Sequence, residues 1–363
     1  MKAAVSYETN TLLRVDEVTL DDPQENEVLV KLVAAGTCHS DLHFMKGDIP
    51  VLTPVVMGHE GAGIVEKVGP GVTTLEPGDH VVLMVAFSCG KCHYCVAGRP
   101  TLCVENLPVQ SMCTLPGGGI RLHKGDQELR HLFGLACFAE YAVVHERSAV
   151  RVRKDAPLDV VCLLGCGTST GIGAVLNTAG VDAGESIAIY GCGGVGLSAV
   201  MAAKLAGAGM IIAVDTLEQK LEMASDLGAH YVVNASQENP QQKVLELTGT
   251  GADYAVPCVG NADVIMQAFG SMHSGGTCVV VGLPPIGVNL SIAPYELLQG
   301  KVLTGTTQGD VRAPIDIPRY VDLYMDGRLP IDKLITTSCD LEQINEAYEA
   351  LERGEVIRTI IRF

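Results

Sequence analysis

Tryptophan is absent from the 363-residue sequence, and aromatic residues of all kinds make up only 4% of it. The apolar core must therefore consist mainly of valine, isoleucine, leucine and alanine. Hydrophobic residues still amount to 47%, which over this length is enough to build two domains that each have a core.

Positive charge is also scarce, since 25 lysines and arginines face 42 aspartates and glutamates, for a formal net charge of −17. This balance argues against nucleic acid as a partner, because phosphates require a basic patch. No run of about 18 apolar residues predicts a membrane span, and the first residues lack the apolar segment of a signal peptide. We expect a cytoplasmic protein that does not bind a membrane.

Cysteine, in contrast, is plentiful, with thirteen in the chain. Disulfides are rare in a reducing cytoplasm, where clustered cysteines more often bind metal. Four of them share one fifteen-residue stretch, with two, two and seven residues between successive thiols: Cys89, Cys92, Cys95 and Cys103. Four thiolates suit a tetrahedral ion and leave no position open, so the stretch predicts a structural zinc site. The alternative is a loop of unligated thiols.

The pattern of predicted secondary structure changes near residue 160. Before that point it consists of short β segments separated by glycine and proline. From Ser186 onward, short apolar strands alternate with helical stretches, which predicts a doubly wound parallel sheet in an α/β fold. The six predicted strands are 186–190, 210–215, 230–234, 253–259, 277–282 and 302–305.

A glycine-rich motif, G-x-G-G-x-G, follows the first of these strands and opens a helix. Gly191 allows the tight turn, Gly193 lets a pyrophosphate approach the backbone, and Gly196 lets the helix lie close to the sheet. Asp215 ends the next strand, where its carboxylate accepts from the ribose hydroxyls of NAD and repels the 2′-phosphate of NADP. Lys220 also comes within reach of that ribose. The alternative is an ordinary glycine turn followed by a solvated aspartate.

A second metal site is indicated more diffusely, by residues from three separate segments. Cys38, His59 and Cys166 together provide two thiolates and one imidazole, a set that leaves a fourth position of a zinc ion open for catalysis. Each residue alone also fits a structural role, as a buried thiol or as a histidine satisfied within a loop.

Longer motifs resemble those of the zinc-dependent medium-chain alcohol dehydrogenase family. The resemblance rests on "GHEGAGIVEKVGPGV", on the four-cysteine stretch, on "GCGTSTGIGAVLNTAGVDAGESIAIYGCGGVGL" and on the terminal "GEVIRTIIRF". The spacing resembles the long-loop branch, which includes liver-type enzymes and glutathione-dependent formaldehyde dehydrogenases. The resemblance implies a GroES-like catalytic domain of residues 1–167 and 308–363, a Rossmann domain of residues 168–307, and a homodimer or, alternatively, a homotetramer.

The resemblance also assigns the catalytic zinc and a proton path. It implies zinc ligation by Cys38, His59 and Cys166, with transient binding by Glu60, and a hydrogen bond from His59 to Asp41. It further implies two relay residues that carry the substrate proton outward, and cofactor contacts from both domains. The relay residues are Ser40 and His43, and the cofactor contacts are His39, Thr170, Gly191, Gly193, Gly194, Val195, Gly196, Asp215, Lys220 and Arg358.

The implied reaction is reversible oxidation of an alcohol to an aldehyde, with NAD as acceptor and two zinc ions per chain. By position, an apolar set of residues lines the substrate pocket: Ile49, Val85, Leu132, Leu283 and Thr307. This lining favours a hydrophobic primary alcohol, allylic or aryl. Formaldehyde dehydrogenases of the family carry an arginine soon after the last structural cysteine and an acid in the pocket, where this chain has Leu107 and Ile49. A thiol adduct is therefore the alternative substrate.

Three other interpretations stay open at this stage. A nicotinoprotein would hold NAD permanently, and only the absorbance of the purified protein distinguishes it. A zinc-free quinone reductase would share the scaffold, but it would lack Cys38 and the four-cysteine stretch. A non-enzymatic structural or zinc-storage protein would bind metal without reducing NAD when an alcohol is added.

Overall fold

The computed structural model describes residues 1–363 and divides into two compact units. Unit 1 comprises Met1–Cys166, Arg312–Gly327 and Ile331–Phe363, and unit 2 comprises Gly167–Val311 and Arg328–Pro330. The sequence predicts the return to the first domain at residue 308, whereas the chain first returns at Arg312. The intervening residues stay in unit 2 because Asn177 donates to the Gly309 carbonyl and Thr178 donates to Asp310.

Unit 2 is built on a six-stranded parallel sheet with the order β14-β13-β12-β15-β16-β17. This is the strand order of a dinucleotide-binding fold. Successive strands are added on one side of the first strand, β12, and then, from the fourth strand, β15, on its other side. The doubly wound sheet predicted from the sequence is therefore confirmed. Its strands are β12 (Ser186–Tyr190), β13 (Met210–Asp215), β14 (Tyr231–Asn234), β15 (Ala252–Pro257), β16 (Met272–Val280) and β17 (Val302–Gly305).

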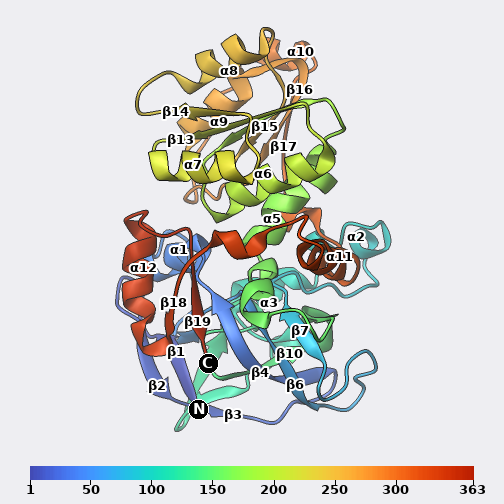
Figure 1. Ribbon diagram of the computed structural model, residues 1–363. Helices are drawn as coiled ribbons and strands as arrows, with labels where there is room; N and C mark the ends of the chain where they lie inside the picture. Colours follow the sequence, from blue (N-terminus) through green and yellow to red (C-terminus); the bar gives the residue numbers. More distant parts are fainter. The chain divides into compact units, whose positions relative to one another are not determined.

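Helices cover both faces of this sheet, α6 and α7 on one and α8 and α9 on the other (Figure 1). Coverage on both sides explains why the central strands read as continuous apolar runs instead of alternating ones. Glycine ends α6 in a left-handed cap at Gly207. The helices are α5 (Gly167–Gly173), which continues into a π-helical turn, α6 (Gly194–Ala206), α7 (Glu218–Leu227), α8 (Pro240–Thr248), α9 (Ala262–Gly270) and α10 (Pro294–Leu298).

Unit 1 is β-rich and contains two sheets. The first has the order β11-β7-β6-β4-β19-β18, with β10 also paired to β4, and the second has the order β2-β1-β5-β9-β8-β3. The first comprises β4 (Glu27–Gly36), β6 (Gly61–Val68), β7 (His80–Leu83), β10 (Tyr141–His145), β11 (Ala149–Val152), β18 (Ile335–Asp340) and β19 (Arg358–Arg362). The second comprises β1 (Lys2–Ser6), β2 (Arg14–Glu17), β3 (Thr19–Leu20), β5 (Val55–Val56), β8 (Leu122–Lys124) and β9 (Gln127–His131).

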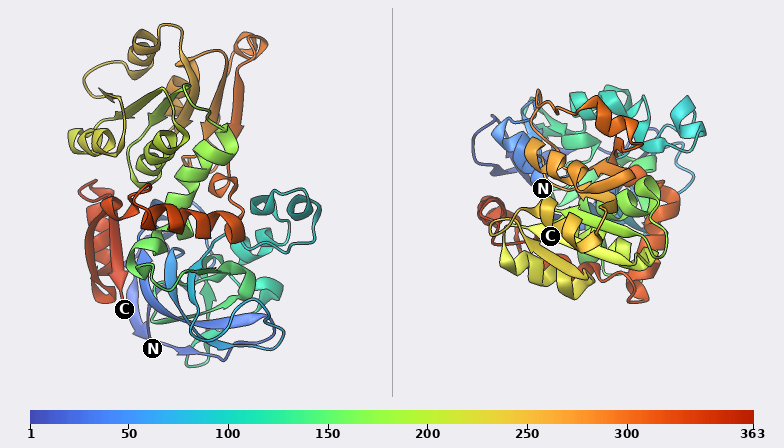
Figure 2. Two further views of the ribbon diagram at one scale, coloured as in Figure 1. Left: turned by 45° about the vertical axis from the view of Figure 1, so that its right-hand side comes forward. Right: turned by 90° about the horizontal axis from the view of Figure 1, so that it is seen from above.

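The strand nearest the C-terminus completes the first sheet. β19 lies antiparallel to β4, with Ile360 opposite Gly36 and Arg362 opposite Ala34. Figure 2 shows both chain ends within this unit. The pairing brings the segment after Gly354 beside the end of β4, where the candidate metal ligands begin.

Short helices connect the strands of unit 1 and pack on the sheets. Of these, α1 begins directly after Cys38, ends in a left-handed cap at Gly47 and packs against α12. The helices are α1 (His39–Lys46), α2 (His93–Val96), α3 (Asn106–Met112), α4 (Leu158–Val161), α11 (Ala313–Met325) and α12 (Ile344–Glu352).

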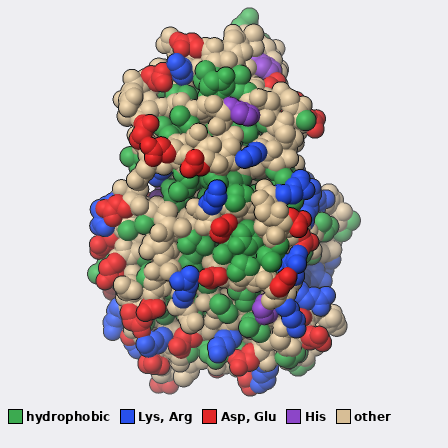
Figure 3. All heavy atoms as spheres, in the orientation of Figure 1, with side chains coloured by type: hydrophobic (Ala, Val, Ile, Leu, Met, Phe, Trp, Pro, Cys, Tyr) green, Lys and Arg blue, Asp and Glu red, His purple; other side chains and the backbone are tan.

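The surface carries charges of both signs. On the face drawn in Figure 3, acidic and basic side chains are interspersed. No single helix is long and apolar enough to cross a bilayer, and only one pair, Leu158–Gly165 with Gly167–Ala179, reaches that length and composition across a sharp bend.

Candidate active site

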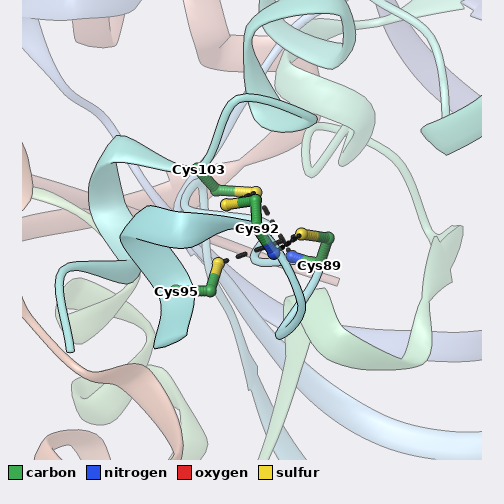
Figure 4. Close-up of side chains that lie close together, drawn as sticks. All are labelled: Cys89, Cys92, Cys95 and Cys103. Carbon is green, nitrogen blue, oxygen red and sulfur yellow. Dashed lines mark hydrogen bonds between the residues drawn. The ribbon is translucent and has the colours of Figure 1, made fainter. Parts of the chain in front are cut away.

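The four cysteines of the stretch Cys89–Cys103 converge in a lobe that contains α2 and projects from the β-rich part of unit 1 (Figures 2 and 4). The Sγ atoms of Cys89 and Cys95 are 4.0 Å apart, and those of Cys92 and Cys103 are 3.9 Å apart. A disulfide would bring two sulfurs to about 2.05 Å. Tetrahedral zinc with Zn–S bonds of about 2.3 Å separates its sulfurs by roughly 3.8 Å, so the lobe fits that ion.

Backbone amides also support the sulfurs of this lobe. The Cys89 amide donates to Cys103 Sγ and the Cys92 amide donates to Cys89 Sγ, each at 3.3 Å. Hydrogen bonds from the backbone at Cys95 and Val104 lower the pKa of the Cys92 thiol to about 6, whereas burial raises the pKa of Cys95 to about 12 and that of Cys103 above its usual value. Such donors favour thiolate, which is the form that binds metal.

A second cluster joins residues from three distant segments of unit 1. Cys38 follows β4 and precedes α1, His59 and Glu60 precede β6, and Cys166 is the last residue before the chain enters unit 2. Their ligand atoms all lie within 4.8 Å of one another. His59 is completely buried, and its Nε2 has no hydrogen-bond partner. An orphaned imidazole nitrogen beside two thiols and a carboxylate fits a zinc ion.

Asp41 fixes the orientation of His59. Its Oδ1 lies 2.9 Å from His59 Nδ1 and also accepts from the Gly58 amide at 3.2 Å. A ring nitrogen held in this way leaves the opposite nitrogen free for a metal. Burial opposes the charged imidazole, but Asp41 and then Cys38 outweigh it and raise the pKa of His59 to about 10. The neighbouring Cys166 and His59 hold the pKa of Cys38 well below its usual value.

Glu60 forms an ion pair with Arg358, and both side chains are buried. Gly36 makes room for the pair, because a Cβ at this position would lie 2.7 Å from Glu60 Oε2. In the structure Arg358 thus neutralises the fourth residue of the cluster. Its contact with the cofactor pyrophosphate, implied by the resemblance, stays a prediction.

The two residues of the predicted proton path lie on α1. Ser40 Oγ is 3.7 Å from Cys38 Sγ, so the hydroxyl borders the cluster. His43 Nδ1 lies 2.9 Å from Asp48 Oδ2, and its side chain is 30% exposed. One residue therefore adjoins the candidate metal site and the other reaches the solvent. His39, at the first position of the same helix, keeps its predicted role in cofactor binding as a prediction.

Phe133 is a neighbour of the cluster that sequence reasoning missed. Its ring meets the rings of His59 and Phe44 edge-on, each at a centroid distance of 5.3 Å. The adjacent Leu132, expected in the substrate pocket, is completely buried. Phe133 has a φ of +54°, a left-handed conformation that is uncommon for residues other than glycine, and no sequence pattern announces it.

The remaining residues of the predicted pocket divide between the two units. In unit 1, Val85 is buried and Ile49 is half-buried against the core. In unit 2, Leu283 is largely exposed and Thr307 precedes the turn at Gln308–Asp310. Their assignment to a common pocket stays a prediction.

The glycine motif of unit 2 has the geometry that its spacing predicts. Gly191 follows β12 with a φ of +95°, and a Cβ on Gly196 would lie 1.8 Å from the Gly191 carbonyl oxygen. A Cβ on Gly193 would meet nothing within 4 Å, so its backbone stays open to an approaching phosphate. Gly194 and Val195 begin α6, whose free amides favour an anion.

Asp215 ends β13 beside this loop. Its Oδ2 accepts from the Cys192 amide at 2.7 Å, and its Oδ1 accepts from the amides of Thr216 and Leu217. These bonds fix the carboxylate next to the glycine turn. Lys220 lies on α7, and Thr170 lies on α5. The fit of the loop supports a bound dinucleotide, and the contacts of the individual residues stay predictions.

Comparison with known proteins agrees with both units. Residues 24–154 match the family "Alcohol dehydrogenase GroES-like domain", and residues 194–325 match the family "Zinc-binding dehydrogenase". A Synechocystis protein named S-(hydroxymethyl)glutathione dehydrogenase is 40% identical over 366 residues, which cover 100% of this chain and 99% of the relative.

Two solved structures are also similar. An alcohol dehydrogenase zinc-binding domain protein from Burkholderia ambifaria is 39% identical, with a TM-score of 0.96, over 100% of this chain and 98% of the other. A benzyl alcohol dehydrogenase from Acinetobacter calcoaceticus is 36% identical, with a TM-score of 0.95, over 100% of this chain and 99% of the other.

Proposed function

Because the chain belongs to the zinc-dependent medium-chain alcohol dehydrogenase family, we propose that it oxidises the hydroxymethyl group of a small-thiol adduct, with NAD as the acceptor. It is an oxidoreductase that acts on a CH–OH group and uses zinc together with a nicotinamide dinucleotide. The observation that carries the proposed substrate is the full-length similarity to a protein named for S-(hydroxymethyl)glutathione.

The site residues have distinct proposed roles in this reaction. Cys38, His59 and Cys166 hold the catalytic zinc, and Asp41 keeps His59 Nε2 directed at it. When bound, the zinc supplies Lewis acidity that makes the substrate hydroxyl more acidic, and the nicotinamide accepts a hydride. The chain must then remove a proton without flooding the site with water.

Ser40 and His43 are proposed to provide that proton path. The Ser40 hydroxyl borders Cys38, and His43 lies one turn further along α1, where it is partly exposed and contacts Asp48. A hydroxyl relays a proton because it both donates and accepts hydrogen bonds. His43 then passes the proton to solvent.

The preference for NAD over NADP is proposed from Asp215. Three backbone amides fix its carboxylate at the end of β13. The negative charge of this carboxylate accepts hydrogen bonds from the ribose hydroxyls of NAD and repels the 2′-phosphate of NADP. We expect Asp215→Gly to lower the NAD-to-NADP ratio of kcat/KM by at least about 10-fold, which corresponds to about 1.4 kcal/mol. An unchanged ratio would exclude this role for Asp215.

A benzylic or other hydrophobic primary alcohol is the second candidate substrate. It is favoured by the similarity to a benzyl alcohol dehydrogenase and by the Phe133 ring, which lies edge-on to His59. Leu107, which occupies the position of the family's glutathione-binding arginine, is 68% exposed and brings no positive charge. A thiol that carries no carboxylate therefore fits the first candidate better than glutathione itself.

The two candidates separate in a direct kinetic comparison. The zinc-loaded enzyme is assayed with NAD and either formaldehyde plus a thiol or benzyl alcohol, with formaldehyde alone as the control. The thiols are glutathione and N-acetylcysteamine, of which only the first carries carboxylates; the acetyl group prevents the second from closing to a ring with formaldehyde. The proposal predicts a kcat/KM for a thiol adduct at least about 10-fold above that for benzyl alcohol. A preference for benzyl alcohol would establish the second candidate instead.

A further inference from the structure

Two polar atoms lie buried and unpaired behind the catalytic cluster. One is Oδ2 of Asp41, whose other oxygen holds His59 and the Gly58 amide. The other is the hydroxyl of Tyr348 on α12, a residue that is 2% exposed. A buried carboxylate oxygen or hydroxyl without a partner destabilises the folded protein, so both atoms require a partner.

The packing brings these two residues into one neighbourhood. Helix α12 packs against α1, the helix that carries Asp41. The Tyr348 ring meets the Phe138 ring edge-on at a centroid distance of 6.1 Å. Phe138 in turn fills the space beside Gly58, where a Cβ would lie 2.6 Å from its ring. Gly58 is the residue whose amide donates to Asp41.

Charge also connects the two side chains. A phenol has an ordinary pKa of about 10, so Tyr348 is protonated at neutral pH and is a hydrogen-bond donor. Burial and then the negative charges of Asp41 and Cys38 raise its pKa further. A carboxylate accepts from such a donor, and charge-assisted hydrogen bonds are stronger than neutral ones.

We propose that the Tyr348 hydroxyl donates a hydrogen bond to Oδ2 of Asp41 and thereby acts as a positioning residue for the catalytic zinc. The chain of contacts runs from Tyr348 to Asp41, then to His59 Nδ1, and leaves His59 Nε2 directed at the metal. Tyr348 touches neither the metal nor the substrate. The inference rests on the proposed zinc ligands and is independent of the proposed substrate.

The thiol of Cys137 is a second donor close to Asp41. The charge of Asp41, after burial, raises the pKa of this thiol well above its usual value, so the thiol also stays protonated. A thiol is a weaker donor than a phenol. We therefore assign the main support of Oδ2 to Tyr348.

The rate of zinc release tests this assignment without any substrate. Enzyme loaded with two zinc ions per chain is mixed with excess chromogenic chelator. The release of zinc from the open site is followed separately from the release of zinc from the four-cysteine lobe. We expect Tyr348→Phe to release the catalytic zinc about 3- to 10-fold faster, below the 10- to 100-fold typical of direct outer-shell partners. The lobe serves as an internal reference and should be unaffected.

Tyr320→Phe is the matched control, because it removes the hydroxyl of another buried tyrosine of unit 1, on α11. It should release zinc at the wild-type rate. In an Asp41→Asn background, Tyr348→Phe should accelerate release less than it does alone, since the two act through one contact. Three results would each overturn the proposal: Tyr348→Phe releases zinc at the wild-type rate, Tyr320→Phe accelerates release as much as Tyr348→Phe does, or the effects of Tyr348→Phe and Asp41→Asn are fully additive.

A second replacement covers the case in which Tyr348→Phe unfolds. A 3-fluorotyrosine at position 348 keeps the ring and the hydroxyl and strengthens the donor, because fluorine makes the phenol more acidic. The proposal predicts slower zinc release from this protein than from the wild type. Release at the wild-type rate or faster would contradict it.

Discussion

The two metal clusters of unit 1 are built in opposite ways. The four-cysteine lobe takes all its ligands from the stretch Cys89–Cys103, and its own backbone amides support the sulfurs. The other cluster takes Cys38, His59 and Cys166 from segments that only the folded sheet brings together. The first site is therefore a property of a loop, and the second is a property of the fold.

This difference in construction indicates different roles for the two sites, one structural and one catalytic. A closed set of four thiolates leaves no position for a substrate and contributes folding energy instead. The distributed set has three proposed ligands and a fourth candidate, Glu60, which forms an ion pair with Arg358. Outer residues such as Asp41 must then hold the geometry that a short loop supplies by itself. The variants below test this contrast, in decreasing order of their expected effect on turnover.

Removing a ligand of the distributed site should have the largest effect. Cys38→Ser weakens zinc binding at the open site, so we expect kcat/KM to fall by more than about 100-fold, beyond the range of outer-shell changes. Zinc analysis should give one ion per chain instead of two, and circular dichroism should be unchanged. Wild-type turnover in this variant would refute the assignment of the catalytic zinc.

Removing the support of His59 should have the next largest effect. Asp41→Asn keeps the size of the side chain but removes the charge that faces His59 Nδ1. We expect zinc affinity at the open site to fall by about 10- to 100-fold, measured by chelator competition. The lobe should keep its zinc. An equal loss from both sites would show that the two are not independent.

Crowding the Glu60–Arg358 pair should have a smaller effect. The Cβ of Gly36→Ala would lie 2.7 Å from both Glu60 Oε2 and Leu163 Cδ2, so the neighbours must shift. We expect overpacking to cost about 1–3 kcal/mol of stability, measured by denaturant unfolding, and turnover to fall less than in Asp41→Asn. Gly98→Ala, in the lobe, is a control, because nothing lies within 4 Å of that Cβ, although its positive φ adds some strain.

Removing a ligand of the lobe should affect turnover least and stability most visibly. Cys103→Ser removes one of the four thiolates of the lobe, and Cys103 is buried. We expect a loss of about 3 kcal/mol, which lowers Tm by about 4 °C at an unfolding entropy of about 2.1 cal/mol/K per residue. The turnover of each folded molecule should match the wild type. A turnover loss as deep as that of Cys38→Ser would abolish the contrast between the two sites.

Much of the fold was predictable because local patterns determine it. The strands predicted at 186–190, 210–215 and 302–305 match β12, β13 and β17. The first two are buried parallel strands, which read as short apolar runs. β16 instead begins at Met272, ahead of the predicted start at residue 277. The intervening His273, Ser274 and two glycines have little strand propensity, and pairing with β15 extends the strand across a register shift.

The candidate site was most directly predictable where one motif contains its residues. The four cysteines and the glycine turn lie within short stretches, so their spacing carries the information. The Glu60–Arg358 pair and the approach of Tyr348 to Asp41 depend on β19 pairing with β4 and on α12 packing against α1. Phe133 was missed because its place beside His59 depends on a left-handed turn that no sequence pattern announces.

The pairing of β19 with β4 has a consequence for biosynthesis. A ribosome completes the four-cysteine loop within fifteen residues, so a nascent chain can acquire its first zinc ion early. The strand that carries Arg358 emerges only after all of Gly167–Val311, and until then β4 has an unpaired edge at Ala34–Gly36. Cotranslational metal loading can therefore reach the lobe first. The ligands of the open site have all emerged by Cys166, but Arg358 joins Glu60 only when the chain returns.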